Sequence, residues 1–427
     1  MLFSKANWEY VTSIYVGLAI FLCSALALVI ESGYSYGPAL LFLASLSLII
    51  YRPKISITKD DWKFVGLLLS YFTVYVLYNV GFSLSSRAYD GISRFLLVIP
   101  VYFLLISYPP KPIYFWSGLI IGAIGAGVFA IYQKFYLPVP LDRAGGFINP
   151  IQFGDISFLM ASLLLCGFVW ARYTHQTLFI HFVFLLASLT GFVASFLSLS
   201  RGGWLAFPVV LFIVLKALKV QTQKILVSFA VFTLISTIAI VSLPDSNFFR
   251  QRLVETKSDV SSLLKISSSR ESFSINARLR MWQIGINAFC ARPFTGWGSL
   301  DAIKLQYPSE WADLEAIDNF NHLHNEFIDT MAKRGLLGLI TLMLLYFLPL
   351  SVFMKLMRSE DKILVSFAAC GVILIVCVII FGLTQTFMAH ISGITIIPFF
   401  LAIIKAYTRM IEAGNKLSRK LMRTPSL

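Results

Sequence analysis

The sequence contains a long series of apolar runs, each close to the length that crosses a lipid bilayer. A spanning helix needs roughly 20 consecutive apolar residues. Because hydrocarbon offers the backbone no hydrogen-bonding partner, each run must form a helix. The chain of 427 residues therefore predicts an all-α, polytopic membrane bundle of about twelve spans, near 11–30, 35–51, 64–83, 95–108, 115–132, 151–170, 178–199, 203–218, 225–243, 335–354, 363–385 and 393–411.

Composition excludes an ordinary soluble protein. Apolar residues make up 58% of the chain and charged residues only 13%, whereas soluble domains carry about 25% charged residues. The formal charge of +14 does not require nucleic acid as a partner, because basic residues also mark membrane topology and bind anionic lipid.

The basic residues gather on one side of the predicted bundle. Lys and Arg are retained in the cytoplasmic connections of membrane proteins. If the chain starts inside, most of them, together with the tail at 405–423, fall on that side. We therefore predict that both termini are cytoplasmic, since the short external connections hold only Arg87, Arg94, Lys134, Arg143 and Arg201.

One long polar segment interrupts the apolar runs and divides the chain. We expect residues 1–243 to form spans one to nine, and 244–334 to form an external loop domain. Residues 335–427 should then contain the last three spans and a basic cytoplasmic tail. The external loop is the part of the chain most suited to a water-exposed active site.

The external loop contains a predicted helix that begins near Ser274 and ends before Pro293. It places Arg278 and Trp282 four residues apart on one face. Gly296 and Gly298 after it indicate a turn, because glycine adopts backbone conformations that other residues avoid. Helical spacing predicts an apolar stripe on this helix made of Ile275, Leu279, Trp282 and Ile286.

Two polar motifs carry candidate chemistry. His324, which lies just before the tenth span, could exchange a proton at the membrane surface. Arg201 lies between two apolar runs and is followed by two glycines. A guanidinium there needs an anionic partner, and its planar fork fits phosphate oxygens. A solvated loop histidine and an arginine that reaches outward are the structural alternatives.

These motifs together resemble the O-antigen ligase and polymerase superfamily. The resemblance rests on Ser-Arg-Gly-Gly-Trp-Leu at 200–205, Arg-Leu-Arg-Met-Trp at 278–282 and His-Asn-Glu-Phe at 324–327. It implies a membrane glycosyltransferase of the fold type called C. Such proteins transfer glycan from undecaprenyl diphosphate at the periplasmic face of the bacterial inner membrane, and the ligases among them use lipid A-core as acceptor.

The resemblance also implies roles for individual residues. His324 matches the histidine that deprotonates the acceptor, while Arg201 and Arg278 match arginines that bind the diphosphate. Asn149 lies in a further matching motif, and its role stays open. Two near neighbours could replace these candidates: Arg280 could bind the diphosphate, and His322 could support or replace His324.

The expected reaction is a metal-independent displacement that inverts the anomeric centre, with no cofactor. Arginines can stabilise the leaving diphosphate, and a histidine can accept the acceptor's proton. A hard-cation site could alternatively form at Asp313, Glu315 and Asp318, although a solvated acidic face explains the same spacing.

Two other functions fit parts of the sequence. A polymerase of the same superfamily would join one lipid-linked glycan to another. A transporter of lipid-linked glycan would fit the number of spans, although coupled transporters usually carry ionisable residues near the bilayer midplane. The partners expected for the ligase are the lipid-linked donor, lipid A-core and membrane lipid.

Overall fold

The computed structural model describes residues 5–51, 53, 56–139, 141–221, 223–224, 273–315 and 321–423. Every regular element in these ranges is a helix. The helices are α1 (Lys5–Ala25), α2 (Gly33–Ser45), α3 (Ser47–Tyr51), α4 (Lys59–Gly81), α5 (Arg87–Ser107), α6 (Pro112–Phe135), α7 (Pro150–Tyr173), α8 (Leu178–Leu197), α9 (Arg201–Trp204), α10 (Phe207–Ala217), α13 (Phe273–Ala291), α14 (Leu300–Gln306), α15 (Pro308–Glu315), α16 (Glu326–Leu356), α17 (Lys362–Thr384), the 3₁₀ turn η2 (Phe387–Ala389) and α18 (Ile391–Arg423).

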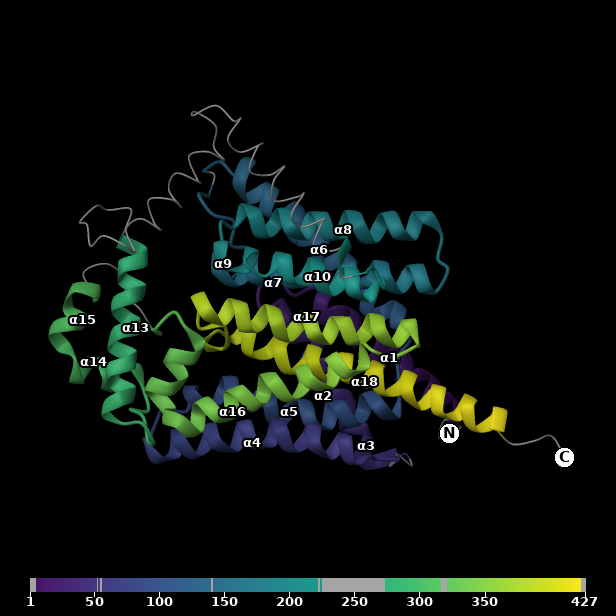
Figure 1. Cartoon of the computed structure of the whole chain (residues 1–427), viewed down its shortest axis with the longest axis horizontal. Coiled ribbons are helices and arrows are strands. Elements are labelled where there is room, and N and C mark those ends of the chain that lie inside the picture. Colours follow the sequence, from purple (N-terminus) through teal and green to yellow (C-terminus); the bar gives the residue numbers. More distant parts are fainter. Residues whose placement is uncertain are drawn as a thin grey trace.

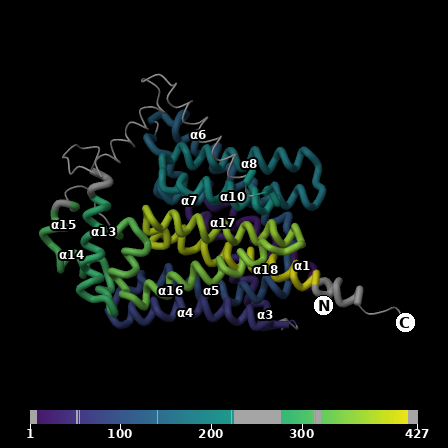
Figure 2. The backbone as a smooth tube through the Cα atoms, in the orientation of Figure 1, coloured from purple at the N-terminus to yellow at the C-terminus, as the bar shows by residue number. Residues whose placement is uncertain are grey.

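The long helices run roughly side by side in one bundle, and the short helices α13 to α15 gather at one end of it (Figure 1). The tube view shows the same path, with α18 ending at the opposite end of the bundle (Figure 2). Three helices form the centre: 83% of the spanning segment of α7 is buried, 78% of that of α17 and 94% of that of α18. The site described below lies where these central helices reach the α13 end.

The predicted fold class is confirmed. In the part of the chain that the structure describes, ten helices are long and apolar enough to cross a membrane. They coincide with ten of the twelve predicted spans. The ninth predicted span, at 225–243, lies outside the described residues.

The eighth predicted span, at 203–218, is shorter than expected. The chain turns after α9, and α10 begins at Phe207 with Pro208 in its first turn. Proline is well tolerated there, because the first N–H groups of a helix lack intrahelical partners anyway. The 11 residues of α10 extend about 16 Å, roughly half the thickness of the hydrocarbon core.

Helices α13 to α15 have a small apolar core of their own. On α13 the buried side chains include Met281 and Ile284, which pack with Trp311 and Leu323. The predicted apolar stripe of α13 was therefore wrong in part: Leu279 is 38% exposed and Ile286 45% exposed. The face of α13 that carries small residues packs against α16, and this turns Leu279 and Ile286 toward the surface. A Cβ on Gly285 would lie only 2.5 Å from Ile328 and 2.7 Å from Leu323, which shows how closely the two helices approach.

The predicted turn after α13 is confirmed, and it docks on a kink in α16. Gly296 and Gly298 both have positive φ, and Gly298 N–H donates to the Lys333 carbonyl oxygen (2.8 Å). Gly335 has φ 60° and ψ −160° inside α16. Leu336 N–H donates to the Pro293 carbonyl oxygen (2.7 Å), so the kink joins α16 to the turn that follows α13. The boundaries predicted for the external domain remain predictions.

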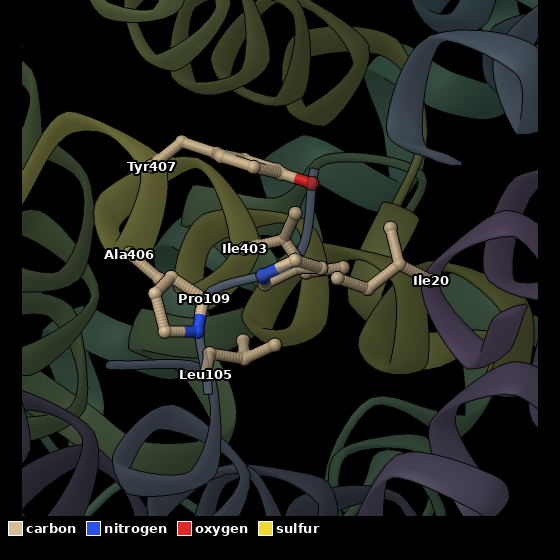
Figure 3. A pocket seen from close by; sticks show the side chains of 7 residues that line it. Ile20, Leu105, Pro109, Ile403, Ala406 and Tyr407 are labelled. Carbon is tan, nitrogen blue, oxygen red and sulfur yellow. The ribbon is translucent and has the colours of Figure 1, made fainter. Parts of the chain in front are cut away.

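A small pocket lies between α1, α5 and α18. Ile20, Leu105 and Ile403 line it together with Pro109 and Tyr407 (Figure 3). These walls are apolar and lie far along α18 from the α13 end, so this pocket is not part of the candidate site.

Candidate active site at the α13 end of the bundle

Three histidine rings meet where α16 begins and α17 ends. The ring centroids of His322 and His324 are 4.3 Å apart, and those of His322 and His390 are 5.3 Å apart. His324 has a positive φ of 50°, which histidine tolerates better than most residues. Its N–H donates to Nδ1 of His322 (3.3 Å). The structure thus brings together the two histidines that the sequence singled out and adds a third.

The residues that follow His324 fasten this loop to the bundle. The Asn325 side chain accepts hydrogen bonds from Phe327 N–H and Ile328 N–H, both at 3.0 Å, and so caps α16. Its amide also donates to the Leu383 carbonyl oxygen (3.1 Å) at the end of α17. These bonds explain why an asparagine follows the histidine, since it fixes the ring relative to both helices.

Two carboxylates of α16 fix the surrounding segments: Glu326 bonds to η2, and Asp329 bonds to the histidine loop. The Glu326 carboxylate accepts a hydrogen bond from Met388 N–H (2.9 Å), and the Asp329 carboxylate accepts one from Leu323 N–H (3.0 Å). Asp329 also pairs with Lys333 (2.8 Å). Each of these carboxylates is buried, and each has a structural partner in the loop or the helix.

The three rings are neutral at pH 7. Burial lowers the pKa of His322 to about 3, and that of His324 and His390 to about 4 each. At His324 the positive charge of Arg278 adds to the effect of burial, because it disfavours an imidazolium nearby. A neutral imidazole carries a lone pair, so His324 is in the form that can accept a proton.

Arg278 is the loop arginine whose positive charge acts on His324. Its guanidinium acts electrostatically on His324 and also on the Asp155 carboxylate in α7. Arg280 lies two residues further along α13 and is exposed. At about 100° per residue, it points about 200° around the helix from Arg278. The two arginines, which the sequence left as alternatives, therefore point in different directions from α13.

Arg201 lies at the same end of the bundle. It is exposed at the start of α9. The following Gly202 packs so tightly that a Cβ there would overlap the Thr384 hydroxyl. This contact brings the Arg201 turn to the end of α17, next to Gln385. A side chain larger than hydrogen at Gly202 would push the turn away from that helix.

Asp155 connects the two arginine motifs. It is fully buried in α7, and the Ser200 hydroxyl donates to its Oδ1 (3.0 Å). The same carboxylate lies within electrostatic reach of Arg278. A Cβ on Gly203 would lie 3.1 Å from Oδ1 of Asp155, so the glycine permits the turn to sit over the carboxylate.

Asn149 joins the histidine cluster from α7. Its amide nitrogen lies 3.3 Å from Nδ1 of His390, and its side-chain oxygen accepts Gln152 N–H (2.9 Å) to cap α7. The loop before it is tied to the Arg201 motif, since Arg143 donates to the Ser198 carbonyl oxygen (2.9 Å). The predicted supporting residue is thus in contact with the cluster.

Sequence reasoning missed His390 and Gln385. The Gln385 side-chain nitrogen lies 2.9 Å from Nε2 of His390, and its side chain also hydrogen-bonds to His324. Gln385 therefore links the rings of two histidines. The only sequence signal was the position of both residues at the external end of a predicted span, where a polar pair is unusual.

The alternative cation site cannot be placed. The side chains of Asp313 and Glu315, and the whole of Asp318, lie outside the described residues. Within the residues that are described, no three His, Cys, Asp or Glu side chains are grouped so that they could hold a metal ion.

The fold and these contacts define a polytopic helical membrane protein with a cationic, histidine-containing site at one end. The sequence model of the O-antigen ligase family matches residues 186–343. That region runs from α8 to the first half of α16 and includes Arg201, Arg278 and His324. Residues 186–343 are therefore similar to the O-antigen ligase family, as the motifs predicted.

Two proteins of known sequence are similar to this chain. An uncharacterized protein of Haemophilus influenzae is 29% identical over 394 residues, which cover 88% of this chain and 94% of that protein. The O-antigen ligase of Escherichia coli K12 is 28% identical over 170 residues, covering 39% of this chain and 40% of that ligase. The similarity to the ligase is thus confined to part of both chains.

Proposed function

We propose that this protein is an O-antigen ligase of the bacterial inner membrane. It would transfer glycan from undecaprenyl diphosphate to a sugar of lipid A-core at the periplasmic face. The observation that carries the proposal is that the Arg278 guanidinium acts on a neutral His324 ring. The family match over 186–343 supports the same reaction class.

In the proposed reaction the arginines act on the glycan donor, and the histidine acts on the acceptor. Arg278 and Arg201 bind the diphosphate and stabilise the negative charge that grows as the anomeric C–O bond breaks. His324 accepts the proton of the acceptor hydroxyl as its oxygen forms the new glycosidic bond. Attack from the face opposite the diphosphate inverts the anomeric centre. His322, Gln385 and Asn149 act as positioning residues.

A transfer assay with purified protein, lipid-linked donor and lipid A-core tests this proposal. His324→Ala should lower the rate by about 10²- to 10⁴-fold, because a general base is lost. Arg278→Ala and Arg201→Ala should each lower it by about 10²- to 10³-fold through loss of charge stabilisation. Addition of a chelator should leave transfer unchanged, and the product should have inverted configuration.

Arg87→Ala is the matched control, because Arg87 is an exposed arginine in a predicted external connection. It should transfer at the parent rate. If Arg280→Ala loses activity while Arg278→Ala keeps it, the assignment of the loop arginine is wrong. Loss of transfer with chelator would overturn the metal-independent reaction.

The same assay separates the ligase from the other functions. A ligase forms glycan linked to the core, whereas a polymerase lengthens the lipid-linked glycan without using lipid A-core. A transporter would move lipid-linked glycan across vesicles and would keep doing so in the His324→Ala variant. Either of these outcomes would replace the proposed function.

A further inference from the structure

A second cavity lies far from the histidines, between α4, α16 and α18. Its volume is about 460 Å³. Lys405 lines it, 14 residues along α18 from Ile391, which corresponds to about 21 Å of helix. The cavity is therefore separate from the candidate active site, and nothing in the proposed reaction uses it.

The cavity opens sideways through the surface that would face lipid. Leu344, Leu348 and Val352 of α16 line it and are between 40% and 49% exposed. Leu401 of α18 forms part of the lining and is fully buried. A membrane lipid could thus enter between α4 and α16 and place an alkyl chain along these apolar walls.

Lys405 supplies a buried charge to this largely apolar cavity, which Asp60 and Lys63 also line. The side chain is only 8% exposed, and no carboxylate of the described residues forms an ion pair with it. Three acids act on Lys405 electrostatically. Asp60, which also lines the cavity, pairs with Lys63 (3.1 Å), and Asp61 pairs with Arg409 (2.7 Å). Glu412 lies about two turns further along α18 and forms no ion pair with Lys405. An ammonium group at a lipid-facing cavity is costly without an anionic partner.

We propose that this cavity binds an anionic glycerophospholipid from the membrane leaflet at that end of the bundle, with its phosphate on Lys405. The lysine ammonium is a compact single charge, which matches one phosphodiester better than a diphosphate. Ser70 and Ser351 line the same cavity. Their hydroxyls donate to the Leu67 and Leu348 carbonyl oxygens, and their oxygen atoms can still accept a hydrogen bond from a headgroup hydroxyl. Anionic lipids concentrate at such basic membrane surfaces.

Native mass spectrometry of the detergent-purified protein tests the site with dioleoyl phosphatidylglycerol as probe. The parent should retain this lipid about tenfold more than dioleoyl phosphatidylcholine, a difference of about 1.4 kcal/mol. Lys405→Met should remove the preference, and Lys405→Arg should keep it. Lys355→Met is the matched control, because Lys355 is exposed on α16 and does not line the cavity.

Gly66→Phe provides a second test that leaves the charge in place. Gly66 lines the cavity, and a Cβ there meets no atom within 4 Å, so the ring can fill the space without a clash. It should abolish retention of the lipid. Undiminished binding in both Lys405→Met and Gly66→Phe would overturn the site. Stronger retention of undecaprenyl phosphate than of phosphatidylglycerol would overturn the choice of lipid. If inorganic phosphate stabilised the protein as much as phosphatidylglycerol does, the effect would be ionic only and the lipid site would be overturned.

Discussion

At the scale of single residues, the proposed site depends on one histidine that stays uncharged beside an arginine. His324 gains this state from its surroundings, since burial and Arg278 both act against the imidazolium. The positive φ of His324 and the cap formed by Asn325 hold the ring in place. A base with a lowered pKa is weaker, but it is present in its active form across the whole physiological pH range.

The pKa of His324 should therefore respond to Arg278 and not to Arg280. Removal of a positive charge stabilises the imidazolium, so Arg278→Gln should raise the pKa from about 4 toward the ordinary value of about 6.5. NMR titration of histidine-labelled protein, with His324→Gln to assign the signal, measures this change. Arg280→Gln is the control and should leave the pKa unchanged. Equal shifts in both variants would contradict the geometry described here.

The histidine cluster also shows where sequence reasoning reaches its limit at this scale. His324, Arg201 and Arg278 could be found because each lies in a polar motif next to an apolar run. His390 and Gln385 could not, because their importance comes from contacts with residues far away in sequence. Spacing along the chain does not contain that information.

At the scale of helices, long apolar runs were predicted well and their packing faces were not. The ten described spans follow from hydropathy alone. On α13 the apolar Leu279 and Ile286 are exposed, while Ala277 and Ala288 are buried. Periodicity places apolar side chains on a face, but the close approach of α16 selects the face with small residues. Near a membrane the apolar stripe need not point to the protein core.

The kink in α16 gives a prediction at this scale. Gly335 has φ 60° and ψ −160°, and a Cβ there would lie 2.5 Å from the Phe294 carbonyl oxygen. Only glycine adopts this region readily, and other residues lose about 1–3 kcal/mol. Gly335→Ala should therefore lower the melting temperature and loosen the turn at 293–298, which would reduce transfer.

Gly66→Ala is the control for this experiment, because Gly66 lies inside α4 and a Cβ there meets no atom within 4 Å. Alanine in a helix interior is better than glycine by about 0.5–1 kcal/mol, so this variant should melt at or above the parent temperature. A Gly335→Ala protein as stable as the parent would show that the kink is not required.

At the scale of the whole molecule, the two ends of the bundle have different chemistry. The helices α13 to α15 gather at one end (Figure 1), and the histidine cluster lies at the same end, where α16 begins. The other end carries the cavity with Lys405 and the ends of α16 and α18. The distribution of basic residues predicts that the first end is periplasmic and the second cytoplasmic. The proposed transfer to lipid A-core and the proposed phospholipid site both depend on this orientation.

The native cysteines allow this orientation to be tested directly. Cys290 in α13 is exposed, whereas Cys23, Cys166, Cys370 and Cys377 are buried. A membrane-impermeant maleimide should therefore label Cys290 in right-side-out vesicles. Cys290→Ser should remove the labelling.

An introduced cysteine reports on the other side of the membrane. Glu360 lies in the turn between α16 and α17, and its side chain is 93% exposed. In the Cys290→Ser background, Glu360→Cys should react only in inverted vesicles, because the membrane separates that turn from α13. Labelling of Glu360→Cys in right-side-out vesicles, together with protection of Cys290, would reverse the bundle. The histidine cluster would then face the cytoplasm, and transfer at the periplasmic face would be impossible for this protein.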